Sequence, residues 1–128
     1  MTSLPSNNDF TKAVRDLLDS WLDSVFGPLY HFTYRIKLSR FHSDPPEVLL
    51  LNNPALLYSE TVQIFDSELI AESFMCTFLR YSRELGLENS PPCNEFIRWF
   101  KNKDIATITS IIKTLHELRS RRYRIGFY

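Results

Sequence analysis

The spacing of apolar residues constrains this chain more than any other feature of its sequence. From Phe10 to Leu118, apolar side chains recur three and four positions apart, the period of α-helices that bury one face. Only three glycines occur among 128 residues, whereas β-sandwiches and barrels need frequent turns. The sequence therefore predicts an all-α protein, folded as a single-domain orthogonal or irregular helical bundle of five to seven helices.

Capping residues divide this domain, residues 1–128, into its expected helices. Gly27-Pro28 suits the end of one helix and the start of the next, and Asn53-Pro54 suits another start. Asp44 with Glu47 three residues later predicts a capping box, and Asp104 suits a later N-cap. The expected helices are residues 9–26, 28–41, 45–50, 54–66, 68–85, 94–102 and 104–120, followed by a C-terminal tail at 121–128.

Two of these helices have a pattern that bears on function. In the first helix, Asp16, Asp19 and Asp23 lie opposite the apolar stripe, and we expect them to form a solvated face rather than a metal site. The second helix is apolar on several sides, with Leu29, Phe32 and Ile36 on one of them, and cations are interleaved at 35, 37 and 40. We expect it to be buried on two sides with its cations reaching to solvent, although a sticky or phosphate-contacting face would have the same composition.

The last helix and the tail supply the candidate interaction residues. Ile108, Ile112 and Leu115 recur at helical spacing, which fits either a core-facing helix or a short coiled-coil-like dimer seam, because two heptads are too few to decide. In the tail, Ile125, Phe127 and Tyr128 are apolar and should be buried, by folding back onto the core, by docking on a partner or a second subunit, or by binding a ligand.

The same end of the chain is strongly basic. Residues 1–97 hold seven Lys and Arg against thirteen Asp and Glu, whereas residues 98–128 hold eight against two. Arginines can contact phosphates and a tyrosine can stack on a base, so this end is a candidate nucleic-acid interface. Cations near a helix C-terminus also stabilise the helix through its dipole, so such a cluster can occur without any ligand. The candidate nucleic-acid-binding residues are Arg119, Arg121, Arg122, Tyr123 and Arg124.

Motifs that would indicate an enzyme are missing from the sequence. It has no glycine-rich phosphate loop and no metal-binding CxxC or HExxH pair, and its three histidines are scattered. Cys76 and Cys93 are too few for a disulfide framework, and we expect Cys76 to be a small core residue. The longest apolar run, VLLL at 48–51, is far shorter than the roughly 20 residues of a membrane span. We therefore expect a cytoplasmic protein without catalytic residues, metal or cofactor.

Part of the chain resembles a known family. The stretches LDSVFG at 22–27, KLSRF at 37–41, PEVLLLNNPALLYSETVQIFDSE at 46–68 and LGL at 85–87 are similar to the Nitrosopumilus output domain family, a helical module of archaeal signalling proteins. Phe26-Gly27, Asn53-Pro54 and Ile64-Phe65 match the family pattern, but Asp66 replaces its second glycine. The resemblance covers about residues 22–87 and implies a regulatory or interaction role in an archaeal cytoplasm, with no catalytic residue.

Two functions remain open at this point. The aromatic-rich composition and the opposite charge of the two ends favour a small non-enzymatic regulatory or protein-interaction module that self-associates. The alternative is a nucleic-acid-binding accessory protein that uses the C-terminal arginine cluster.

Overall fold

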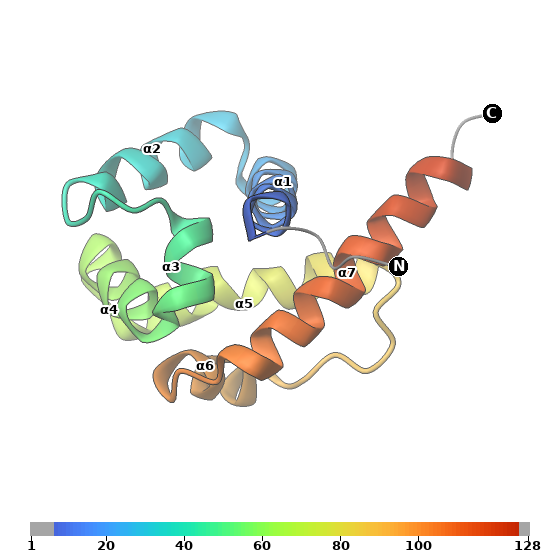
Figure 1. Ribbon diagram of the computed structural model, residues 1–128. Coiled ribbons are helices and arrows are strands. Elements are labelled where there is room, and N and C mark those ends of the chain that lie inside the picture. The colour runs from blue at the N-terminus through green and yellow to red at the C-terminus, as the bar shows by residue number, and fades with distance from the viewer. Residues whose placement is uncertain (1–6, 126–128) are drawn as a thin grey trace.

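The computed structural model describes residues 7–125, which form seven α-helices and no strand (Figure 1). The predicted all-α fold of five to seven helices is therefore confirmed. The helices are α1 (Asn7–Phe26), α2 (Pro28–Ser39), α3 (Pro46–Asn52), α4 (Pro54–Phe65), α5 (Glu68–Leu85), α6 (Cys93–Lys101) and α7 (Ile105–Ile125).

Local sequence explains most of the helix ends. Gly27 separates α1 from α2 with a φ of 89°, which a residue with a side chain rarely adopts. The Asn53 side chain accepts a hydrogen bond from the Leu56 amide at the start of α4, and Ser67 caps α5 in the same way. Asp66 takes the left-handed conformation, with a φ of 53°. The turn between α4 and α5 therefore forms although Asp66 stands where the resemblance expects glycine.

Most predicted helix boundaries agree with the structure to within two residues, but one predicted cap and one predicted helix end are wrong. At α3 the N-cap is Pro45, with no side-chain cap, because the Glu47 carboxylate binds Arg35 instead of completing a capping box. At the other end of the chain, α7 continues to Ile125 rather than ending at residue 120. No glycine or proline lies between Asp104 and Ile125, so the sequence contains no helix-breaking residue before Gly126.

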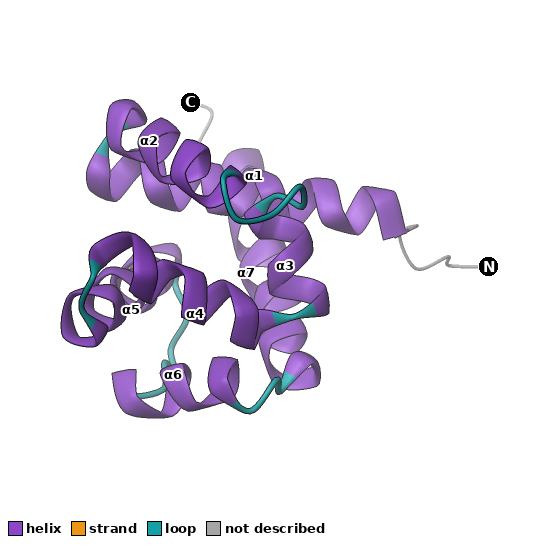
Figure 2. Cartoon of the chain, turned by 90° about the vertical axis from the view of Figure 1, so that its left-hand side faces the viewer, coloured by secondary structure: helices purple, strands orange, loops and turns teal. Residues whose placement is uncertain are grey.

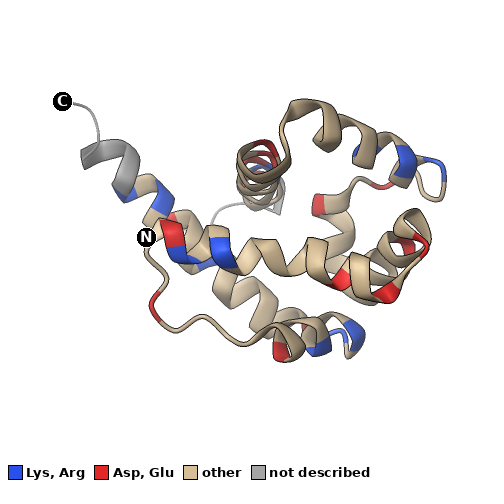
Figure 3. Ribbon diagram, turned by 180° about the vertical axis from the view of Figure 1, so that it is seen from behind, with Lys and Arg blue, Asp and Glu red and all other residues tan. Residues whose placement is uncertain are grey.

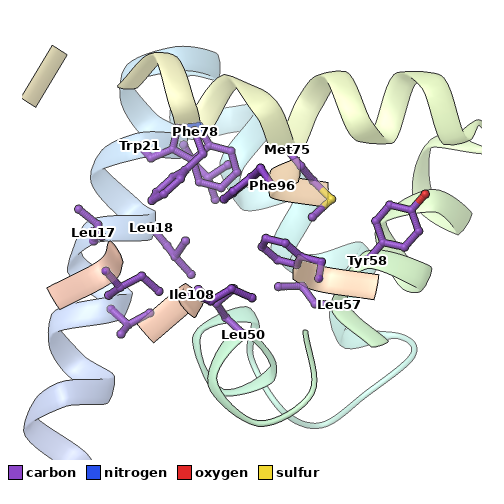
Figure 4. Close-up of a cluster of buried hydrophobic side chains, with 14 of the residues drawn as sticks. Leu17, Leu18, Trp21, Leu50, Leu57, Tyr58, Met75, Phe78, Phe96 and Ile108 are labelled. Carbon is purple, nitrogen blue, oxygen red and sulfur yellow. The ribbon is translucent and has the colours of Figure 1, made fainter. Parts of the chain in front are cut away.

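Helix α5 lies across the middle of the molecule and packs against α1, α4, α6 and α7, while α2 lies at one edge and packs on α1 and α4 (Figures 1 and 2). Between them is a core of large apolar side chains from all seven helices, among them Leu18, Phe78 and Ile108 (Figure 4). Two side-chain hydrogen bonds join α1 to α5: Trp21 donates to Thr77, and Tyr81 donates to Ser20.

Candidate functional site

The apolar stripe of α7 belongs to the core. Ile108, Ile112 and Leu115 are 3%, 2% and 0% exposed. Their side chains are covered by neighbouring helices of the same chain, so they cannot also form a free dimer seam. Of the two interpretations that the spacing allowed, the core-facing helix is correct and the dimer seam is wrong.

The predicted C-terminal sites lie largely outside the described side chains. Arg122, Tyr123, Arg124 and Ile125 are described only as backbone of α7, and Phe127 and Tyr128 lie beyond residue 125. Of the candidate nucleic-acid residues, Arg119 is half-buried, and Arg121 is exposed with one guanidinium nitrogen 3.9 Å from a Glu117 oxygen. The described basic positions are spread over several helices and interleaved with acidic ones (Figure 3).

Helix α2 presents its large apolar side chains to solvent. Leu29, Phe32 and Ile36 are 74%, 62% and 39% exposed, whereas the buried residues of α2 are His31, Tyr34 and Leu38. Val25, at the end of α1, is 39% exposed as well. The expectation that this helix is buried on two sides is therefore wrong. Leu29, Phe32 and Ile36 follow one another at i, i+3 and i+7, so they form one stripe along the helix, which we call the outer stripe.

The inner face of α2 carries the buried Leu38 and also polar side chains that form hydrogen bonds to α1. His31 Nδ1 lies 2.7 Å from Asp23 Oδ1, and Arg35 Nε donates to His31 Nε2 at 2.6 Å. Because the guanidinium Nε always carries a proton, His31 Nε2 must accept, which leaves the Nδ1 proton to be donated to Asp23. Asp19 Oδ1 is 3.2 Å from the same Nε2, but both atoms are acceptors for Arg35 and do not bond each other.

Arg35 joins three helices. Its two terminal nitrogens donate to Asp19 Oδ1 of α1 at 2.8 Å and to Glu47 Oε1 of α3 at 2.9 Å. The Glu47 side chain is 6% exposed, and Arg35 is its ion-pair partner in this buried position. Asp19 and Asp23 thus bind the inner face of α2, although both stay partly exposed, whereas Asp16 is exposed as the prediction of a solvated face expected. We call Asp19, Asp23, His31, Arg35 and Glu47 the polar clamp.

The sequence contains a signal for the polar clamp that helical periodicity alone does not reveal. Asp19 and Asp23 are four residues apart on one helix, and His31 and Arg35 are four residues apart on the next, with Gly27 between the helices. Matched acidic and basic pairs on either side of a tight turn can face each other when the two helices pack. The position of Glu47 has no comparable signal, because it depends on the path of the chain from α2 to α3.

Tyr34 connects the inner face of α2 to α4. Its hydroxyl lies 2.9 Å from Thr61 Oγ1, and Thr61 donates in turn to the Leu57 carbonyl. Burial raises the pKa of Tyr34 to about 12, although the hydrogen bond to Thr61 and the charge of Arg35 lower it. The neutral hydroxyl is therefore the form that the folded protein holds.

A groove of about 290 Å³ lies between α2 and the corner where α4 meets α5. Phe74 of α5 lies at the centre of its aromatic lining, with ring centroids 4.9 Å from Phe26, 5.0 Å from Tyr34 and 4.9 Å from Phe65. Phe74 is nevertheless only partly buried. Lys37 supplies the cation of the lining. Sequence periodicity could not indicate this groove, because its walls come from four helices.

The two cysteines form a disulfide between Cys76 of α5 and Cys93 at the start of α6. The expectation of Cys76 as an unpaired small core residue is therefore wrong. Cys76 is partly buried and Cys93 is exposed, and the bond links the two helices that flank the proline-containing segment 86–92. Their pairing could not be predicted, because a separation of 17 residues along the chain does not determine the distance between two cysteines in space.

No helix in the range 7–125 has both the length and the apolar composition needed to cross a bilayer. In that range, no three His, Cys, Asp or Glu side chains are grouped so that they could hold a metal ion.

In comparisons with known proteins, no protein-family model matches the sequence, and neither a curated protein nor a solved structure is similar to it. The resemblance to the archaeal output domain family therefore stays a prediction.

Proposed function

We propose that the protein is a small non-catalytic interaction module that associates with a second copy of itself through the outer stripe of α2. The observation that carries this proposal is the exposure of Leu29 and Phe32, at 74% and 62%, on a helix that is otherwise firmly fixed. Scattered exposed apolar residues are common, but a row of large ones on one helix face is typical of an interaction site. The proposal relocates self-association from α7, where the apolar residues are buried, to α2.

The outer stripe is nearly symmetric about Phe32. Leu29 lies three residues before Phe32 and Ile36 lies four after it, so an antiparallel second α2 would place Leu29 opposite Ile36 and the two Phe32 rings together. Such a pairing is isologous, the commonest arrangement of homodimers. A contiguous apolar row on each copy would thus cover the other.

The charges around the outer stripe are compatible with this antiparallel arrangement. Lys37 and Arg40 are exposed at the C-terminal end of α2, whereas the N-terminal end of α2 lies beside Asp23, whose side chain is 47% exposed. In an antiparallel pair the basic end of one α2 lies beside the acidic end of the other. Opposite charges at a rim favour the encounter and its orientation more than the final affinity.

A non-catalytic role is supported by the state of the buried polar residues. Both ring nitrogens of His31 are engaged, by Asp23 and by Arg35, and Arg35 is engaged by Asp19 and Glu47. These groups therefore position α2 and are not poised for proton transfer to a bound molecule.

The disulfide bears on the conditions in which the module works. Disulfides persist in oxidising surroundings and are rare in the cytoplasm of organisms other than hyperthermophiles. We therefore propose a setting that preserves the Cys76–Cys93 bond, rather than the reducing cytoplasm that the sequence suggested. Protein purified without reductant should show no reactive thiol after unfolding, and two thiols per chain would contradict this setting.

Sedimentation equilibrium tests the self-association. We expect a reversible monomer–dimer equilibrium in the micromolar range, and we expect Phe32→Glu to weaken it by more than tenfold, because a carboxylate would be buried against an apolar surface. Thr114→Glu, at an exposed position of α7, is the matched control and should leave the equilibrium unchanged. A wild-type protein that stays monomeric at several hundred micromolar would overturn the proposal.

A further inference from the structure

The groove between α2 and the α4–α5 corner is a separate surface from the outer stripe. It is lined by the side of α2 that carries Tyr30, Tyr34 and Lys37, whereas Leu29, Phe32 and Ile36 do not contribute to it. Its volume of about 290 Å³ is close to the lower limit of small-molecule sites, which is about 300 Å³. The question is which chemical class of molecule the lining would accept.

The body of such a molecule would have to be apolar. Phe74 is in contact with the rings of Phe26, Tyr34 and Phe65, and yet part of its own surface remains accessible. Ile70 lies one turn before Phe74 on α5, is 52% exposed and extends the apolar surface on that side of the helix. Aromatic and aliphatic surface of this kind gains most by covering an alkyl chain or a ring.

Apart from Lys37 and the exposed Tyr30, the polar residues that line the groove are already committed. The His31 ring is held by Asp23 and Arg35, the Tyr34 hydroxyl pairs with Thr61, and the Thr33 hydroxyl donates to the Leu29 carbonyl. Lys37 differs from them, because within the described part of the chain its ammonium group forms no ion pair and no side-chain hydrogen bond. It is therefore available to a ligand.

The charge of Lys37 selects the sign of the ligand. An aromatic pocket alone would also suit a quaternary ammonium group through cation–π contacts. Here the lining contains a lysine and no carboxylate, so a cationic ligand would be repelled and an anionic one attracted. An anionic group would also avoid the negative faces of the rings by lying at Lys37.

We propose that this groove binds an amphipathic anion, with its alkyl or aromatic body on Phe74 and its anionic head at Lys37. The inference does not depend on the proposed dimer, since the groove is complete within one chain. It goes beyond the interaction role, because it assigns the module a small ligand.

Isothermal titration calorimetry tests the proposal with three probes that share an unbranched ten-carbon chain, kept below the concentration at which they form micelles. Decanoate should bind at least about tenfold more tightly than decanol, and decyltrimethylammonium should bind most weakly. Lys37→Met should remove the preference for decanoate and leave decanol unchanged. Lys12→Met is the matched control, since Lys12 is an exposed lysine on α1, 14 residues and roughly 21 Å along the helix from Phe26.

Two further measurements show whether decanoate binds in this groove and whether its binding is independent of the dimer. Amide resonances of Phe26, Lys37 and Phe65 should shift on adding decanoate, and Phe32→Glu should bind decanoate as the wild type does even if no dimer is ever observed. Failure of dimerisation would thus leave this inference standing. Equal binding of all three probes, no effect of Lys37→Met, or shifts confined to other helices would each overturn it, as would a lack of decanoate binding at millimolar concentration.

Discussion

Helices α2 and α7 orient their side chains in opposite ways with respect to the core. On α7, Ile108, Ile112 and Leu115 are buried while Lys113 and Glu117 are exposed. On α2, large apolar residues are exposed and the inner face is fixed by His31 and Arg35 through bonds to other helices. The position of α7 is therefore fixed mainly by apolar burial, whereas that of α2 depends on directed polar contacts together with the buried Tyr34 and Leu38, which leaves its outer stripe available.

Leucine-to-alanine substitutions on the two helices should give the largest contrast. Leu115 is 0% exposed, so Leu115→Ala should lower the free energy of unfolding by about 3–5 kcal/mol through lost burial and a residual cavity. Leu29→Ala, at a residue 74% exposed, should change it by less than about 0.5 kcal/mol. Urea unfolding measures both changes in the free energy of unfolding, at a protein concentration low enough to dissociate any dimer. Similar losses for the two variants would contradict the contrast.

A second pair of substitutions tests whether directed polar contacts hold α2. Arg35→Met would leave Glu47 and Asp19 without their main partner, and breaking a pair of this kind costs about 3 kcal/mol. Arg15→Met is the matched control, because Arg15 also approaches Asp19, at 4.0 Å, but is 64% exposed. A surface pair of that kind contributes between about 0 and 1 kcal/mol. Equal destabilisation in urea unfolding would show that the polar clamp does not hold α2.

The contrast between the two helices also explains what the sequence could predict. The helices themselves followed from apolar spacing and from caps such as Asn53 and Ser67, because these signals are local. The spacing of Ile108, Ile112 and Leu115 allowed either a core-facing helix or a dimer seam, and the positions of the other helices decide between the two. On α2 periodicity failed, because apolar residues occur on every side of the helix and the partners that bury His31 and Arg35 come from elsewhere in the chain.

The disulfide between α5 and α6 gives a third test of the difference between the α7 side of the molecule and α2. Helix α6 packs on α4, α5 and α7, so the Cys76–Cys93 bond constrains the α7 side of the molecule and not the polar clamp. Closing a loop with a separation of 17 residues stabilises a fold by roughly 3 kcal/mol when the constraint acts on the unfolded chain. Cys76→Ser with Cys93→Ser, or reduction of the wild type, should lower the stability by about this amount.

Hydrogen exchange can localise the effect of the disulfide. After reduction, amides of α6 should exchange faster, while those of the inner face of α2 should change only as much as global stability requires. Reductant should have no effect on the double serine variant, which serves as the control. Loss of protection at α2 before α6 would show that the two regions are not held independently.

Among the buried residues that hold α2, Tyr34 should have the smallest effect at neutral pH, and the sign of this effect should reverse with pH. Tyr34→Phe removes the hydrogen bond to Thr61 and should cost about 1 kcal/mol at pH 7. Burial raises the pKa of Tyr34 from its ordinary value of 10 to about 12. The stability that the buried neutral hydroxyl contributes is therefore complete below pH 10 and is lost between pH 10 and pH 12, because the unfolded chain releases its proton first.

A pKa shift of this size lowers the free energy of unfolding of the wild type by on the order of 2–3 kcal/mol between pH 10 and pH 12. The Tyr34→Phe variant has no hydroxyl to ionise at this position, so it does not undergo this loss. The deficit of about 1 kcal/mol that Tyr34→Phe shows at pH 7 should therefore shrink above pH 10 and change sign at about pH 11. Tyr58→Phe is a useful comparison, since burial and a hydrogen bond to Glu72 also raise the pKa of Tyr58, but Tyr58 lies on α4 outside α2. If the difference between wild type and Tyr34→Phe stays constant from pH 8 to pH 12, Tyr34 is not held as a buried neutral hydroxyl and the inner face of α2 is more open than the structure shows.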